Sequence, residues 1–277
     1  METVTSADGT VIAFDRLVGG DAGTVILIGG AFGFRKFSKM VELAETLADK
    51  YGLTVINYDR RGRGDSTDTP GVYNADNEID DIAALIQAAG GSAALFGWSS
   101  GAALALRAGE SGRVSGITRI VAFEPPFIVD HEGHVPPADL HIRLHELVAA
   151  DRRAETARFY MTKAIGIPAF FVSIMRFTPF WKDTLANANS TPHDWAVMAE
   201  FMRGEAIRAQ DWSNIDVPVL VISGAKSGAL LRKGANAIAT VIPHAEHREL
   251  AKLSHNPNVA ILAPAAGEFL TRSRTTA

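Results

Sequence analysis

Residues 97–101 read Gly-Trp-Ser-Ser-Gly and match the G-x-S-x-G pattern. An apolar run, 93–96, precedes them and predicts a buried strand, and a helical stretch, 102–108, follows. In this context the chain turns sharply at the serine, the glycines avoid collisions with the neighbouring strand and helix, and the Ser99 hydroxyl is raised above the sheet. The alternative is a chance match, which the flanking strand and helix argue against. We therefore predict that Ser99 is a nucleophile that attacks a carbonyl carbon.

A serine hydroxyl is a poor nucleophile unless a base takes its proton. His255 is the candidate base, because it lies late in the chain, in a predicted loop after the last strand, where the order serine–acid–histidine places the base. A surface or structural role is the alternative for any single loop histidine. The other histidines flank a strand edge or lie in the helix-rich middle of the chain (His244 and His247; His131, His134, His141, His145 and His193).

The elements that must position these groups alternate between strands and helices, which predicts a mostly parallel sheet with helices on both faces. A strand over 10–17 follows the hairpin turn Asp8-Gly9 and is expected to start the sheet in an antiparallel sense. Further strands are predicted at 24–28, 54–58, 93–96, 117–123, 217–223 and 247–253, with helices at 36–50, 74–89, 102–108, 230–241 and 259–270.

The middle of the chain, from Phe127 to about Ala209, lacks strand-like alternation and is rich in helix formers interrupted by prolines. We predict a core domain formed by residues 1–126 and 210–277 and a helical cap insertion formed by residues 127–209. Gly29, Ser99, Glu124, Gly224 and His255 all follow predicted strands. Because ligands bind at the carboxyl ends of parallel strands, these residues are expected to converge at one edge of the sheet, under the insertion.

These motifs together resemble the α/β-hydrolase fold, in its compact form with a helical cap. The resemblance covers nearly the whole chain, from the Gly29-Gly30-Ala31-Phe32 loop through residues 59–66, Asp-Arg-Arg-Gly-Arg-Gly-Asp-Ser, to the G-x-S-x-G turn and Ser254-His255. The turn at 59–66 is D-x-R-G-x-G-x-S-like, and it is expected to tie loops together rather than to bind an anion. The resemblance implies that Ser99 is the nucleophile and His255 the base.

The acid of the implied catalytic triad is the point where this chain departs from the pattern. In most relatives a carboxylate follows the strand that corresponds to 217–223, but here the chain continues Gly224-Ala225-Lys226-Ser227-Gly228. Glu124 closes the preceding parallel strand, and some members of the superfamily place their acid there. Glu124 is therefore our candidate acid, and a role in capping the loop or pairing with an arginine is the alternative. Asp216 precedes its strand and is expected at the opposite end of the sheet.

Negative charge on a tetrahedral intermediate needs two N–H donors. One is expected to be the backbone N–H of Ser100, directly after the nucleophile. By resemblance Gly29-Gly30 occupies the family's His-Gly position, which implies the backbone N–H of Ala31 as the second donor. Phe32 and Trp98 are then expected to flank the substrate pocket, with packing in the core as the alternative. Aromatic residues of the insertion either form its own core or line an apolar pocket.

Composition narrows the remaining possibilities. The chain has 277 residues, a net charge of −4 and no cysteine, which excludes disulfides and a cysteine nucleophile. There is no basic stripe, so no nucleic-acid partner is expected, and no targeting or membrane-spanning segment is predicted. A cytoplasmic protein with a small-molecule substrate, monomeric or homodimeric, is the expectation. No nucleotide-binding motif is present, and His141 and His145 lack a metal-site motif, so we expect neither cofactor nor metal.

The leading hypothesis is a serine hydrolase that cleaves an ester or lactone of a small, fairly apolar molecule through an acyl-enzyme. A serine rather than an aspartate at residue 99 argues against epoxide-hydrolase and dehalogenase chemistry. Other chemistry on the same residues is the first alternative, namely C–C bond hydrolysis, perhydrolysis or a biosynthetic cyclisation. A catalytically inert binding protein on the same fold is the second.

Overall fold

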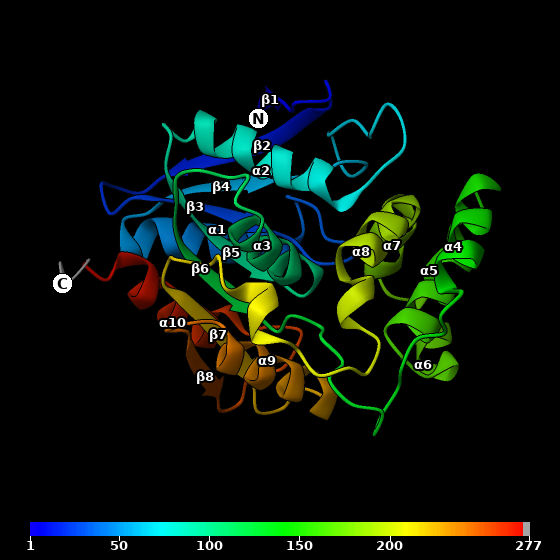
Figure 1. Cartoon of the computed structure of the whole chain (residues 1–277). Helices are drawn as coiled ribbons and strands as arrows, with labels where there is room; N and C mark the ends of the chain where they lie inside the picture. The colour runs from blue at the N-terminus through cyan, green and yellow to red at the C-terminus, as the bar shows by residue number, and fades with distance from the viewer. Residues whose placement is uncertain (274–277) are drawn as a thin grey trace.

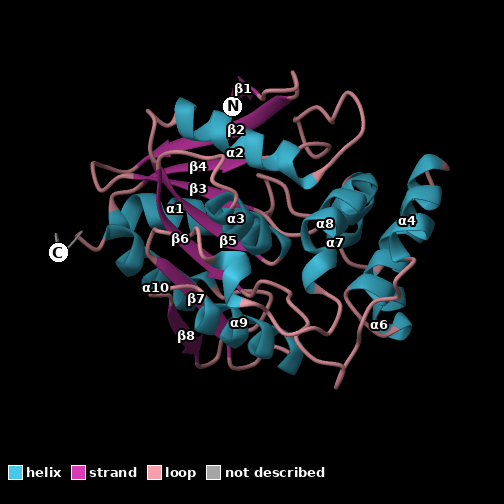
Figure 2. Ribbon diagram, viewed as in Figure 1, coloured by secondary structure: helices cyan, strands magenta, loops and turns pink. Residues whose placement is uncertain are grey.

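The computed structural model describes residues 1–273 and contains an eight-stranded sheet (Figures 1 and 2). The strand order is β1-β2-β4-β3-β5-β6-β7-β8, with antiparallel pairing in β1–β2 and β2–β4 and parallel pairing between all other neighbours. The strands are β1 (Glu2–Thr5), β2 (Val11–Val18), β3 (Thr24–Ile28), β4 (Thr54–Tyr58), β5 (Ala93–Trp98), β6 (Ile117–Phe123), β7 (Val219–Gly224) and β8 (Glu246–Leu250). The predicted antiparallel start and parallel body of the sheet are confirmed.

The central strands carry apolar side chains on both faces of the sheet, and helices therefore cover both faces (Figure 1). One face is covered by α1 (Ser38–Tyr51) and α10 (Val259–Thr271), and the other by α2 (Ala75–Ala88), α3 (Ser100–Glu110) and α9 (Ala229–Val241). Several predicted boundaries differ from the structure by one to three residues. The largest difference is at the last strand, which ends at Leu250 rather than at 253. The strand before Ser99 ends at Trp98 rather than at 96, and the helix after it spans Ser100–Glu110 rather than 102–108. The first helix begins at Ser38 rather than at 36, and the strand predicted from 217 begins at Val219.

A helical segment joins β6 to β7 and lies to one side of the sheet (Figure 1). Within the described chain it contains helices and no strand, as predicted for 127–209. Its α-helices are α4 (Leu140–Ala149), α5 (Arg153–Phe159), α6 (Ala169–Met175), α7 (Phe180–Ala186) and α8 (Thr191–Met198), and a π-helical turn, Tyr160–Ala164, directly follows α5. We call residues 125–218 the helical segment.

The carboxyl ends of the central strands meet at one edge. The backbone N–H of Ser99, after β5, donates to the carbonyl of Phe123 at 2.9 Å, and that of Glu124, after β6, donates to Ile222 of β7 at 2.9 Å. These bonds continue the parallel ladder by one residue beyond each strand. They fix Ser99 and Glu124 in neighbouring positions although the residues are far apart in the sequence.

Candidate active site

The turn at Ser99 has the backbone geometry that its motif predicts. Ser99 has φ 58° and ψ −121°, a conformation that costs a non-glycine residue about 1–3 kcal/mol. A Cβ on Gly97 would lie 2.2 Å from the carbonyl oxygen of Gly101, and one on Gly101 would lie 2.2 Å from that of Ile28. Close packing of β5, β3 and α3 therefore requires both glycines, and the strained turn presents the serine at the N-terminus of α3.

Glu124 and His255 form a close pair at the same edge. The Nδ1 atom of His255 lies 2.6 Å from Oε2 of Glu124, and the carboxylate is fully buried while the imidazole remains partly exposed. The other oxygen, Oε1, accepts a hydrogen bond of 2.7 Å from the backbone N–H of Gly224 at the end of β7. The end of β7, which carries no carboxylate, thus supplies an N–H donor that orients the carboxylate of Glu124 at the end of the neighbouring strand β6.

The Ser99 hydroxyl has no hydrogen bond to His255 in the part of the chain that the structure describes. The Trp98 ring adjoins the imidazole, with the two ring centroids 6.1 Å apart. Hydrogen bonds between a nucleophile and its base are often long without substrate and shorten in the complex. In this structure His255 is therefore bonded to Glu124, and a hydrogen bond between Ser99 and His255 would form only when substrate binds.

The loop after β3 runs directly against the serine turn. A Cβ on Gly30 would lie 2.9 Å from the carbonyl oxygen of Trp98 and 3.0 Å from Cβ of Ser99, so only glycine allows this approach. Among the described residues, neither the backbone N–H of Ala31 nor that of Ser100 has a hydrogen-bond acceptor. Two unused donors thus lie on the two segments that flank Ser99.

Backbone strain gathers at this edge. Six described non-glycine residues have a positive φ, and three of them are Phe32, Ser99 and Glu124, with φ values of 61°, 58° and 49°. Each of the three follows a different central strand. Strained residues cluster where function demands a fixed geometry, so this distribution marks the edge as the candidate active site.

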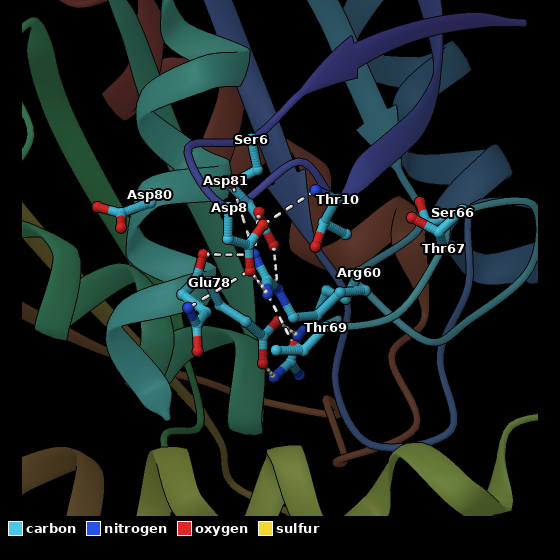
Figure 3. Close-up of polar contacts among 12 residues, drawn as sticks. Ser6, Asp8, Thr10, Arg60, Ser66, Thr67, Thr69, Glu78, Asp80 and Asp81 are labelled. Atoms are coloured by element: carbon cyan, nitrogen blue, oxygen red, sulfur yellow. Dashed lines mark hydrogen bonds and ion pairs between the residues drawn. The ribbon is translucent and has the colours of Figure 1, made fainter. Parts of the chain in front are cut away.

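The basic turn after β4 ties loops together, as predicted. Arg61 pairs with Asp81 of α2 at 2.6 Å and with Asp8 at 2.7 Å, and it also donates to Thr69. Figure 3 shows Asp8, Thr69 and Asp81 close together around this turn. Arg60 forms a two-pronged pair with Glu78, with both contacts at 2.6 Å. Although burial opposes ionisation, Arg60 lowers the pKa of Glu78 to about 2.

Sequence reasoning missed Asp194, a fully buried carboxylate at the start of α8. Its Oδ1 accepts from Arg60 and from the Ser100 hydroxyl, both at 2.7 Å, and its Oδ2 accepts from Arg63 at 2.7 Å. Burial penalises the charged form, but Arg63 and Arg60 still hold the pKa of Asp194 below its usual value. A single aspartate in a helical stretch carries no sequence signal for this role, because its partners lie 94 to 134 residues earlier.

Aromatic side chains of the helical segment approach the same edge. Tyr160 is buried and packs edge-on against Phe32, with ring centroids 5.6 Å apart. Phe37 contacts both Trp98 and Phe180 of α7, at 5.9 and 6.1 Å. Phe32 is thus enclosed between the core and the helical segment, while Trp98 lies beside His255.

The parallel sheet, the strained turn at Ser99 and the buried Glu124–His255 pair are arranged as in an α/β-hydrolase fold. The family model "Alpha/beta hydrolase family" matches residues 25–267, and the chain belongs to this family.

Among solved structures, the chain is similar to an alpha/beta hydrolase from Sphaerobacter thermophilus, with 42% identity, a TM-score of 0.87, and coverage of 97% of this chain and 99% of that one. A thermophilic esterase from Thermogutta terrifontis is similar at 21% identity and a TM-score of 0.68, with 97% of each chain covered. An enol-lactonase from Burkholderia xenovorans is similar at 18% identity and a TM-score of 0.68, over 97% of this chain and 100% of that one. The last two likenesses concern the fold alone. No curated protein matches the sequence.

Residues 1–273 contain neither a cluster of metal-binding side chains nor a membrane-spanning helix. No group of three or more histidine, aspartate or glutamate side chains is arranged to hold a metal ion there. No helix in the same range is long and apolar enough to cross a membrane.

Proposed function

We propose that this protein is a serine hydrolase that cleaves an ester or lactone of a small, fairly apolar molecule through an acyl-enzyme on Ser99. The observation that carries the proposal is the bond of 2.6 Å between His255 and the buried Glu124, beside a serine held in a strained turn. Family membership supports hydrolase activity. The esterase and the enol-lactonase among the similar structures make carboxylic ester substrates the first to test.

His255 acts as the general base in this mechanism. Its Nδ1–H donates to Glu124, which leaves Nε2 free to take the proton of Ser99 as the serine oxygen attacks the carbonyl carbon. The carboxylate orients the ring and stabilises the imidazolium that forms. His255 then returns the proton to the leaving alcohol. Water, deprotonated by the same base, next attacks the acyl-enzyme and releases the acid.

The oxyanion of each tetrahedral intermediate is bound by the backbone N–H groups of Ala31 and Ser100. Both donors lack acceptors among the described residues, and both lie in segments that contact Ser99. The N-terminus of α3 adds a partial positive charge at the same place. Removal of one such donor typically lowers kcat by about 10²–10³-fold, so these two N–H groups are expected to contribute as much to the rate as any side chain outside the triad.

The helical segment serves as a cap over the site, with residues 127–209 as its main body and residues 1–126 and 210–277 as the core domain. Phe32 and Trp98 form the inner wall of an apolar pocket between cap and core. The Nε1 atom of Trp98 is buried and has no hydrogen-bond partner among residues 1–273. An intracellular setting and a small-molecule substrate complete the proposal.

The test is hydrolysis of p-nitrophenyl acetate and butyrate, together with labelling by a fluorophosphonate probe. Wild type should hydrolyse both esters and take up one label, and Ser99→Ala should lose labelling and at least about 10³-fold in kcat. A labelled but ester-inactive wild type would favour C–C hydrolysis, perhydrolysis or cyclisation on the same residues. A wild type that neither hydrolyses ester nor takes up label would identify an inert binding protein.

A further inference from the structure

We propose that Arg63 and Asp194 form a positioning pair that sets the orientation of the oxyanion-binding peptide and couples it to the cap. The inference rests on the proposed function, since it assigns these two residues to the same site. Both side chains are almost fully buried, and they join at 2.7 Å. Arg60 and Arg63 stand at variable positions of the D-x-R-G-x-G-x-S-like turn, so the motif itself does not account for them.

Arg63 restrains the Gly30–Ala31 peptide. Arg63 Nη1 donates to the carbonyl oxygen of Gly30 at 2.7 Å and to that of Gly33 at 3.1 Å. The Gly30 carbonyl and the Ala31 N–H belong to one planar trans peptide and point in opposite directions. Holding this carbonyl therefore fixes the direction of the Ala31 N–H, and a flipped peptide would lose the bond to the guanidinium.

The loop after β3 has few other restraints on its conformation. The loop begins with two glycines, which offer little conformational resistance to a peptide flip. A positive φ at Phe32 adds strain to the same turn. Neutral backbone contacts supply one loop-closing bond, from the N–H of Gly33 to the carbonyl of Gly30 at 3.0 Å. A charge-assisted bond from a buried arginine is roughly twice as strong as such a neutral bond.

Asp194 connects the cap to the oxyanion-binding groups. Asp194 reaches both oxyanion-binding segments at once, because Oδ2 holds Arg63 and Oδ1 holds the Ser100 hydroxyl. Ser100 supplies the second oxyanion donor through its backbone. Arg60 adds a contact of 2.7 Å to Asp194 and one of 3.3 Å to the carbonyl of Gly29. A displacement of α8 would therefore disturb the oxyanion-binding groups on both sides of Ser99, so catalysis depends on the seated position of the cap.

Two variants test the pair. Asp194→Asn removes the charge that holds Arg63. Arg63→Lys keeps the buried charge opposite Asp194, which favours folding, but a single ammonium cannot reproduce the fork that spans the carboxylate and the loop. Asp81→Asn is the matched control, because Asp81 is equally buried and pairs with Arg61 of the same turn but does not touch the oxyanion loop.

The measurements are the rate constant for fluorophosphonate labelling, the fraction of protein that becomes labelled, and the affinity for a trifluoromethyl ketone, whose hemiketal oxygen occupies the oxyanion site. Both variants should label as completely as wild type but about 10–100-fold more slowly, and should bind the ketone more weakly by a similar factor. Asp81→Asn should stay within about twofold. A purely structural role would lower the labelled fraction and leave the rate constant of the labelled protein unchanged.

The outcomes separate the two proposals. If wild type labels and both folded variants label within about twofold of it, the positioning pair is overturned and the proposed function stands. If wild type does not label at all, the proposed function fails and the inference fails with it. A crystal structure of Arg63→Lys gives a readout that is independent of activity. A Gly30–Ala31 peptide that is rotated or disordered there supports the pair, and an unchanged peptide contradicts it.

Discussion

Two fully buried carboxylates, Glu124 and Asp194, differ in their hydrogen-bond partners. Glu124, on the core side, accepts from a histidine and from the N–H of Gly224. Asp194, in α8 of the helical segment, accepts from Arg60, Arg63 and the Ser100 hydroxyl. The first faces a group that can gain a proton during a reaction, whereas the second lies between two permanent cations. A carboxylate stabilises a developing charge only when a neighbouring group becomes charged during the reaction. Glu124 is therefore suited to stabilise a histidine that gains a proton, and Asp194 is suited to hold Arg60 and Arg63 in place.

The comparison predicts opposite rankings for activity and stability. Removing Glu124 should affect turnover most, because the imidazolium loses its counter-charge. Removing Asp194 should affect folding most, because two buried guanidinium groups lose a shared partner.

Glu124→Gln should lower kcat for p-nitrophenyl butyrate by about 10³–10⁴-fold, because the amide presents the wrong hydrogen-bonding partner to the imidazole and carries no charge. Steady-state kinetics on the purified variant measure the loss. Asp216→Asn is the control, since Asp216 is exposed before β7, and it should retain activity within about twofold. Near-normal turnover by Glu124→Gln would remove Glu124 from the triad.

Asp194→Asn should lower the free energy of unfolding by about 3–5 kcal/mol, the usual cost of removing one partner from a buried ion pair. Glu124→Gln should cost about 1–3 kcal/mol, because its donors are a histidine and a backbone amide. Urea unfolding followed by tryptophan fluorescence compares the two variants under one set of conditions. If Glu124→Gln were the more destabilising substitution, the division between a chemical and a geometric carboxylate would be wrong.

Gly224→Ala should destabilise the protein by about 1–3 kcal/mol and lower kcat by about 10-fold. An added Cβ would lie 2.5 Å from the carbonyl oxygen of Leu253, so β7 or the loop that carries His255 must move. The same shift would misdirect the N–H that orients Glu124. Gly71→Ala is the control, since a Cβ there meets no atom within 4 Å. Equal behaviour of the two variants in thermal unfolding and kinetics would argue against this role for Gly224.

His193→Gln should reduce the loss of stability at mildly acidic pH. Burial lowers the pKa of His193 from its ordinary value of 6.5, against the opposing effect of Asp68 and Glu78. The unfolded state therefore binds more protons below pH 6.5, and the contribution of a neutral His193 to stability is lost as the pH falls through its folded pKa.

The difference in unfolding free energy between wild type and His193→Gln should accordingly shrink from pH 7 to pH 5. Urea unfolding at several pH values measures this difference. Replacement of the exposed His145 by glutamine is the matched control and should leave the curve parallel to that of wild type. A pH-independent difference for His193→Gln would contradict a buried neutral imidazole in α8.

Much of the candidate site could be predicted because its signals are local. The apolar runs at 24–28, 54–58 and 117–123 became strands with those bounds, since only a buried extended segment accommodates them. The turn at Ser99 follows from Gly97 and Gly101, whose missing side chains leave room for β3 and α3. The absence of a carboxylate after β7 pointed to Glu124, which the structure places against His255.

Local sequence patterns are enough to predict the central strands, the helical segment and the strained turn at Ser99, because steric fit and apolar periodicity act between near neighbours. Which charged groups meet depends on the tertiary structure. Glu124 reaches His255 across 131 residues because β6, β7 and β8, after which His255 lies, are side by side in the sheet, and Asp194 reaches Arg63 across 131 residues because α8 of the helical segment lies against the turn after β4. A carboxylate and a cation can pair over any sequence separation, so their partners are set by where the packed elements bring them together.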